Sequence, residues 1–120
     1  MTHHFIVPGL GNSGPDHWQT HLEHSGKNVQ RINQHEWDAP RCADWIHTID
    51  GALSPHDASA VVLVGHSLGC AAIVHWASRY NRVIRGALLV APSDVESPRY
   101  AFPAEGFSPL PTDRLGFRTI

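Results

Sequence analysis

The stretch of sequence that decides the fold is Val61-Val62-Leu63-Val64-Gly65-His66-Ser67-Leu68-Gly69-Cys70-Ala71-Ala72-Ile73. It opens with a continuous apolar run, which is typical of a strand covered on both faces of a parallel sheet. From Leu68 onward the pattern predicts a helix that extends to Tyr80 and is rich in small side chains near its start. The chain must therefore pass from strand to helix through the short segment Gly65-x-Ser67-x-Gly69, in a sharp turn centred on Ser67.

The segments on both sides of this turn alternate between strand and helix patterns. Buried strands are predicted at residues 5–7, 29–32, 60–64 and 86–91. Further helices are predicted at about 15–24 and 41–54. A loop rich in Pro, Ser and Gly is predicted at 93–112, followed by the start of a fifth strand at 115–120. This alternation predicts an α/β fold with a mainly parallel sheet in the order 2-1-3-4, to which the fifth strand is added.

Length, charge and cysteine content limit the classes of protein to which the chain can belong. A length of 120 residues predicts one domain, and a formal net charge of −2 argues against nucleic acid or an anionic membrane as partner. The longest apolar runs are too short to span a bilayer, and no secretory signal is evident at the N-terminus. The two cysteines make no disulfide framework, so we expect a cytoplasmic protein.

The turn at Ser67 has the form of a nucleophile elbow, the strand–turn–helix device of α/β-hydrolases. A serine hydroxyl is a weak nucleophile, and it needs a base beside it and donors that stabilise the oxyanion formed on attack. Gly65 and Gly69 leave room where strand and helix nearly touch. The backbone N–H of Leu68, at the positive end of the helix, is the first predicted oxyanion donor.

The second oxyanion donor should come from a loop that follows a neighbouring strand of the sheet. In the order 2-1-3-4 the first and third strands are neighbours, so loops at their carboxyl ends meet in one crevice. Gly9 and Leu10 lie in such a loop, and the Leu10 N–H is the predicted second donor. Asn12, His66 and Trp37 are candidates to line the pocket, although His66 and Trp37 are also expected to pack against neighbouring residues.

Several segments of the chain together closely resemble the YdeN-like serine hydrolases, small α/β-hydrolases related to the retinoblastoma-binding serine hydrolase. The segments are Val7–Gln19 (VPGLGNSGPDHWQ), Trp37–Pro40, Asp44-Trp45, Gly65–Gly69 and Gly86–Pro92. The resemblance extends from Phe5 to Ile120. It implies a three-layer α/β-hydrolase fold, Ser67 as nucleophile, and Leu10 and Leu68 as oxyanion donors. It also implies a cytoplasmic enzyme that needs no metal or cofactor and hydrolyses a small ester or amide.

The same resemblance implies catalytic residues for which this chain has no counterpart. Elbow enzymes place the acid and then the histidine base after the serine, whereas all ten histidines here lie at or before His75. In the family the strand that begins at 115–120 continues into a segment with the acid, and a later segment supplies the base. Asp94 and Asp113 follow Ser67 but do not end a strand in the family's acid position. We therefore expect residues 1–120 to be one C-terminally incomplete domain, the N-terminal portion of a family member.

An incomplete triad leaves alternatives open. Loss of the base in a triad enzyme leaves about 10³–10⁴-fold acceleration over water, so a feeble esterase-like hydrolase is one expectation. The other is an inactive module that binds a partner or self-associates through an open sheet edge. A substitute base from His3, His4 or His35 is a further alternative. His17, His21 and His24 are spaced to share one helical face, yet only adjacent pairs could easily hold one ion, and no metal site is expected.

Overall fold

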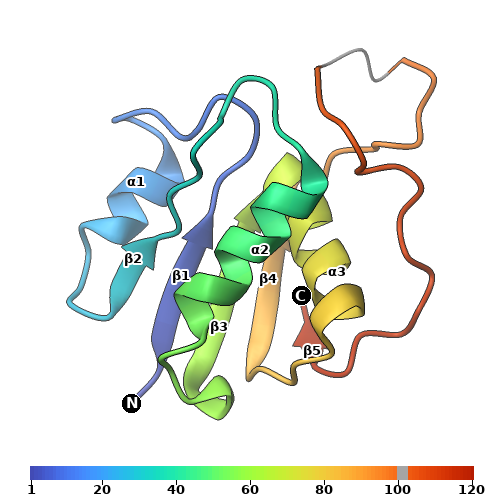
Figure 1. Cartoon of the computed structure of the whole chain (residues 1–120). Coiled ribbons are helices and arrows are strands. Elements are labelled where there is room, and N and C mark those ends of the chain that lie inside the picture. Colours follow the sequence, from blue (N-terminus) through green and yellow to red (C-terminus); the bar gives the residue numbers. More distant parts are fainter. Residues whose placement is uncertain (100–102) are drawn as a thin grey trace.

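The computed structural model describes residues 1–99 and 103–120 as a parallel sheet with helices on both faces (Figure 1). The strands are β1 His3–Val7, β2 Val29–Arg31, β3 Val61–His66, β4 Gly86–Val90 and β5 Arg118–Thr119. The helices are α1 Trp18–Glu23, α2 Cys42–Leu53 and α3 Leu68–Tyr80, with a 3₁₀ turn at Ala58–Ala60. The sheet order is β2-β1-β3-β4-β5, and every neighbouring pair is parallel. The predicted fold class and strand order are confirmed.

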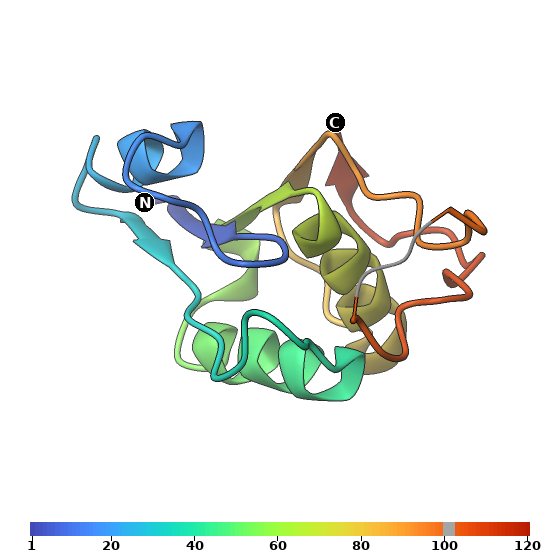
Figure 2. The same cartoon turned by 90° about the horizontal axis from the view of Figure 1, so that it is seen from above.

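Helices α2 and α3 cover one face of the sheet, and α1 lies on the other (Figure 2). Because side chains alternate across a strand, odd-numbered residues of β1 and β3 face α2 and α3. Phe5, Val7 and Leu63 are fully buried there, in the same cluster as Trp45 of α2 and Trp76 of α3. The apolar runs predicted as strands therefore build the main core, as continuous burial of parallel strands requires.

The first helix is shorter than predicted, which changes the placement of its histidines. It begins at Trp18 rather than near Pro15, because His17 has an extended backbone (φ −73°, ψ 146°) and caps the helix. The Nδ1 atom of His17 accepts the N–H of Gln19 at 3.1 Å. His17 consequently does not share a helical face with His21 and His24, and no group of three metal-ligating side chains occurs within residues 1–99 and 103–120.

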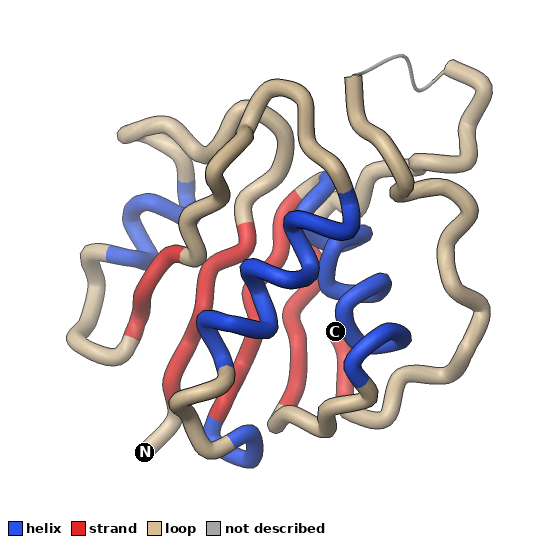
Figure 3. The backbone as a smooth tube through the Cα atoms, in the orientation of Figure 1, coloured by secondary structure: helices blue, strands red, loops and turns tan. Residues whose placement is uncertain are grey.

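The long predicted loop after β4 packs against the helical layer. Residues 100–102 of this predicted loop lie outside the described residues. Beyond them, Glu105 accepts the N–H of Cys42 at 2.8 Å and donates to the Pro40 carbonyl at 2.9 Å. Phe107 is 2% exposed, with its ring centroid 5.7 Å from that of Trp45. Figure 3 shows the chain then passing beside α3 to reach β5, which is only two residues long where six were predicted.

The side of the sheet that carries α1 is only partly covered. Figure 2 shows α1 over β1 and β2, whereas no helix of the described residues lies over β4 and β5 on that side. Leu88 of β4 is 37% exposed there, and Ile120 after β5 is 77% exposed. None of the helices in the described residues has the length and apolar character required to cross a bilayer.

Candidate active site

Ser67 has a backbone conformation that few residues other than glycine adopt. It lies between β3 and α3 with φ 55° and ψ −122°, and its side chain makes no capping hydrogen bond to the helix. Such conformations cost about 1–3 kcal/mol and persist where the surrounding structure enforces them. Here the enforcing elements are the buried strand β3 and the buried first turn of α3, so the hydroxyl is held at the carboxyl end of the sheet.

Two glycines lie where the turn leaves little space for a side chain, most tightly at Gly69. A methyl group on Gly65 would approach Ile73 Cδ1 to 2.7 Å and the Cys70 backbone to 3.3 Å. A methyl group on Gly69 would overlap the carbonyl oxygens of Val7 and Pro8 at the end of β1. The Gly-x-Ser-x-Gly spacing thus accompanies close backbone approach on both sides of Ser67.

The loop after β1 reaches the elbow through Gly9. A Cβ atom at Gly9 would lie 3.1 Å from both Ser67 Cβ and the Leu68 nitrogen. Leu68 is fully buried, and Leu10 is half-buried beside the core. Within the described part of the chain, neither the Leu10 nor the Leu68 N–H donates a hydrogen bond to another residue. The structure thus brings the loop at Gly9 against Leu68, and the N–H of Leu68 and that of Leu10, next to Gly9 in sequence, are both unused among the described residues.

Ser93 is a contact of Ser67 that sequence reasoning missed. The two hydroxyl oxygens lie 2.8 Å apart, and the Ser93 N–H donates to the Ser67 carbonyl at 3.3 Å. The Ser67 N–H donates to the Val90 carbonyl at 3.1 Å, which ties the elbow to the end of β4. Because β4 neighbours β3, the predicted strand order could have indicated this contact, since loops that follow neighbouring parallel strands meet.

His66 packs beside the elbow against α1. Its ring centroid lies 4.6 Å from that of His17 and 5.8 Å from that of Trp18, in edge-on arrangements. Burial, and then the neighbouring His17, lowers the pKa of His66 below its ordinary value. A neutral imidazole packed among rings is consistent with the packing role considered for His66.

Of the other two pocket candidates, Asn12 belongs to the loop that carries Leu10, and Trp37 lies in the segment between β2 and α2 that contacts this loop. Asn12 has φ 67°, and its Oδ1 accepts hydrogen bonds from the Ser13 N–H at 2.8 Å and from Arg31 at 2.9 Å. The Trp37 carbonyl accepts the Gly11 N–H at 2.9 Å, while the Trp37 ring packs 5.7 Å from that of Trp45. In this structure both residues support the loop.

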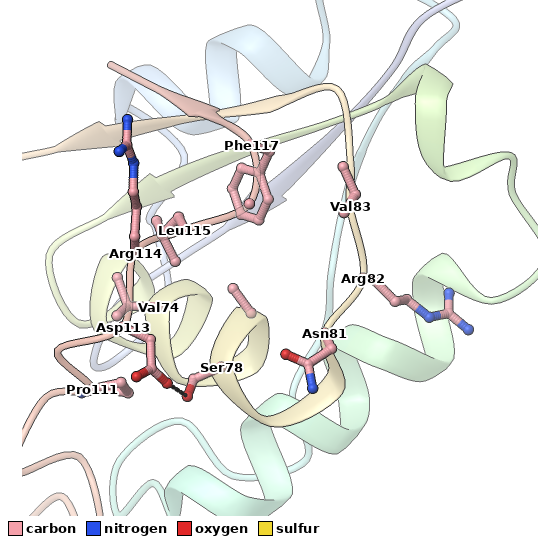
Figure 4. Close-up of a pocket in the computed structure, with 12 residues that line it drawn as sticks. Val74, Ser78, Asn81, Arg82, Val83, Pro111, Asp113, Arg114, Leu115 and Phe117 are labelled. Atoms are coloured by element: carbon pink, nitrogen blue, oxygen red, sulfur yellow. Dashed lines mark hydrogen bonds between the residues drawn. The ribbon is translucent and has the colours of Figure 1, made fainter.

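Several of the histidines and carboxylates considered as partners for Ser67 lie far from it in the sheet or bond to other residues. His3 and His4 begin β1, at the end of the sheet opposite Ser67. His75 Nε2 lies 2.7 Å from the Phe107 carbonyl oxygen. Asp113 accepts the Ser78 hydroxyl at 3.2 Å beside a cavity of about 170 Å³ between the end of α3 and residues 111–117 (Figure 4). Within the described residues the Ser67 hydroxyl is bonded to Ser93 and to no histidine or carboxylate.

The buried thiols are poor alternatives as nucleophiles. Cys70 lies three residues after Ser67, is 1% exposed, and has a sulfur 3.5 Å from the Val90 carbonyl oxygen. Burial raises the pKa of Cys70 to about 11, and burial raises that of Cys42 to about 11 as well. Since the thiolate is the reactive form, Ser67 is the candidate nucleophile of this site.

Comparisons with known proteins agree with this geometry. A family model described as serine hydrolase matches residues 4–120. A crystal structure of a protein named as a YdeN-like hydrolase from Pectobacterium atrosepticum is 31% identical, with a TM-score of 0.83 over 100% of this chain and 61% of that chain. The structure of the ydeN gene product from B. subtilis is 25% identical, with a TM-score of 0.61 over 74% of this chain and 50% of that chain.

This chain thus spans about three fifths of the first of these structures and half of the second. None of the curated proteins with which the sequence was compared matches it. The family match extends over almost the whole chain, and it includes the strand, the elbow and the helix that hold Ser67. The chain belongs to the serine hydrolase family.

Proposed function

We propose that the chain performs acyl transfer through Ser67 on a small ester or amide. The observation that carries this proposal is the strained Ser67, in close contact with the loop at Gly9 and followed by Leu68, with the N–H groups of Leu10 and Leu68 unused among the described residues. Two N–H donors aimed at a developing oxyanion are the usual source of stabilisation in acyl transfer. The amino end of α3 adds a positive partial charge at the same place.

In the proposed reaction, Ser67 Oγ bonds to the substrate carbonyl carbon, and the carbonyl π electrons move onto the oxygen held by the Leu10 and Leu68 N–H groups. The Ser67 proton is released, and collapse of the intermediate expels the alcohol or amine, which takes up a proton. Water then cleaves the acyl–Ser67 ester and restores the hydroxyl. Ser93 orients the Ser67 hydroxyl, but a neutral hydroxyl does not remove a proton at neutral pH, so we propose release to solvent and a slow reaction.

Fluorophosphonate labelling followed by intact-mass measurement tests this proposal. We expect one phosphonate adduct per chain on the wild type and none on Ser67→Ala. Hydrolysis of a short-chain nitrophenyl ester by the same two proteins tests the esterase assignment. A folded wild-type chain that takes up no phosphonate would refute acyl transfer by these 120 residues.

A second candidate function is that of an inactive binding or self-associating module. It is favoured by the uncovered sheet side, where Leu88 is 37% exposed, and by the two-residue edge strand β5. Sedimentation velocity of the wild type, Leu88→Lys and Val83→Lys separates the candidates. Val83 is 63% exposed but lies between α3 and β4, so it serves as the control. A dimer lost only in Leu88→Lys, together with absence of labelling, favours the module; a monomer refutes self-association.

We also propose a cytoplasmic location and a small-molecule substrate rather than a nucleic-acid or membrane partner. The support is two buried free cysteines and a net charge of −2. The proposed acyl transfer uses only a hydroxyl and backbone N–H groups, so it calls for no cofactor. Fractionation of the native host, with detection of the labelled chain, tests the location.

A further inference from the structure

The loop that carries the Leu10 N–H has few backbone hydrogen bonds of its own. Gly11 and Asn12 have positive φ angles of 76° and 67°, a conformation that asparagine tolerates but most residues avoid. The loop's backbone bonds are Gly11 N–H to the Trp37 carbonyl at 2.9 Å, Asn12 N–H to the Gly9 carbonyl at 3.1 Å, and His17 N–H to the Gly14 carbonyl at 3.1 Å. A loop with so few backbone hydrogen bonds needs hydrogen bonds from side chains to keep one conformation.

Gln19 and Thr20 of α1 bond to Ser13 and Gly14 at 2.6 Å, and Arg31, the last residue of β2, adds the support that reaches Asn12. One terminal nitrogen of its guanidinium, Nη1, donates to Asn12 Oδ1 at 2.9 Å and to the Ser13 carbonyl at 2.8 Å. The other, Nη2, donates to Thr20 Oγ1 at 2.7 Å in α1. Three acceptors from two separate segments thus bind one guanidinium. This geometry suits the guanidinium group, whose N–H donors lie in one plane in a fixed arrangement.

The environment of Arg31 makes these bonds strong. Its side chain is 9% exposed, and Nη2 lies 3.1 Å from a carboxylate oxygen of Glu23. A nearly buried cation requires compensating acceptors, and charge-assisted hydrogen bonds are shorter and stronger than neutral ones. Arg31 therefore ties Asn12 and Ser13, two and three residues beyond the proposed oxyanion donor Leu10, to β2 and α1.

We propose that Arg31 is a positioning residue for the oxyanion-binding loop and acts through Asn12 and Ser13. Its catalytic consequence rests on the proposed acyl transfer through Ser67. An oxyanion donor contributes only when it is held in place before the reaction, and a displacement of about 1 Å can cost about 10²-fold in rate. The sequence analysis did not single out Arg31, because its acceptors lie 11 to 19 residues away along the chain.

The test uses two variants. Arg31→Lys keeps the positive charge but lacks the several N–H donors of the guanidinium. Asn12→Gly allows the φ angle of 67° but lacks the Oδ1 acceptor. The exposed Arg85→Lys serves as the matched control. Two readouts are measured on folded protein: hydrogen exchange of peptides that cover residues 8–15, and the second-order rate of fluorophosphonate labelling of Ser67. The double variant completes a double-mutant cycle, which measures how strongly the effects of Arg31 and Asn12 depend on each other.

We expect Arg31→Lys to speed exchange of residues 8–15 and to slow labelling by about 10- to 100-fold. Asn12→Gly should do the same, the double variant should be no slower than the worse single variant, and Arg85→Lys should match the wild type. Unchanged exchange in Arg31→Lys overturns the proposal, and so does faster exchange with an unchanged labelling rate. If the wild type is not labelled at all, the proposed function fails, and the exchange experiment alone decides whether Arg31 holds the loop.

Discussion

Gly69→Ala is the change that most directly tests the packing argument for the elbow. The added methyl group would overlap the Val7 carbonyl oxygen and lie 2.8 Å from that of Pro8. Both atoms belong to the backbone at the end of β1, so no side-chain rotation relieves the overlap and α3 must move away from the sheet. Overpacking of this kind costs about 3 kcal/mol, which lowers the melting temperature of a domain of this size by about 10 °C.

Gly51→Ala is a matched control, because Gly51 lies in α2 and a methyl group there meets no atom within 4 Å. Alanine in an open helical position stabilises by about 0.5–1 kcal/mol relative to glycine. Urea unfolding of the two variants should therefore show shifts of opposite sign. Gly69→Ala should also label more slowly with fluorophosphonate, since movement of α3 displaces the Leu68 N–H. A Gly69→Ala variant as stable as the wild type would refute the close-approach argument.

Three further predictions follow from the site. Ser93→Ala removes the hydroxyl 2.8 Å from Ser67 Oγ, and the loss of about 1 kcal/mol should slow phosphonate labelling about fivefold; an unchanged rate would show that Ser93 does not orient the nucleophile. Burial and the neighbouring His17 lower the pKa of His66, so its contribution to stability is complete above the ordinary value of 6.5 and falls as the pH drops through it. The difference in unfolding free energy between wild type and His66→Asn should therefore shrink between about pH 7.5 and pH 5.5 in urea titrations, and a widening difference would contradict the sign. Because burial raises the pKa of Cys42 and Cys70 to about 11, a chromogenic disulfide at pH 8 should react with both thiols far more slowly in native than in unfolded protein. Equal rates in the two states would contradict their burial.

The elements that the sequence predicted well are those with strong local patterns. Helix α3 spans Leu68–Tyr80 as predicted, and β4 differs from its prediction by one residue. The predicted ends of helices and strands were wrong where contacts between distant segments decide where an element begins or ends. His17 caps α1 from an extended conformation while its ring packs on His66, so the helix starts later than Pro15 and Asp16 suggested. Edge strand β5 covers only Arg118–Thr119, where it pairs with β4.

The same division applies to the candidate site. Ser67, Gly65 and Gly69 could be named from five consecutive residues, since a strand–turn–helix passage imposes its glycines locally. Ser93 and Arg31 could not be named in this way, because each meets its partners only after distant segments pack together.

The sequence by itself determined the alternation of strands and helices, the sharp turn at Ser67 and the membership of a serine hydrolase family. The first two follow from periodicity and turn chemistry, which act over a few residues, and the family follows from the resemblance of several segments to known serine hydrolases. Only the tertiary structure showed the hydroxyl of Ser93 beside Ser67 and the guanidinium of Arg31 behind the loop that carries Gly9. Parallel strands bring the segments after their carboxyl ends together regardless of their separation along the chain, and this assembles the site.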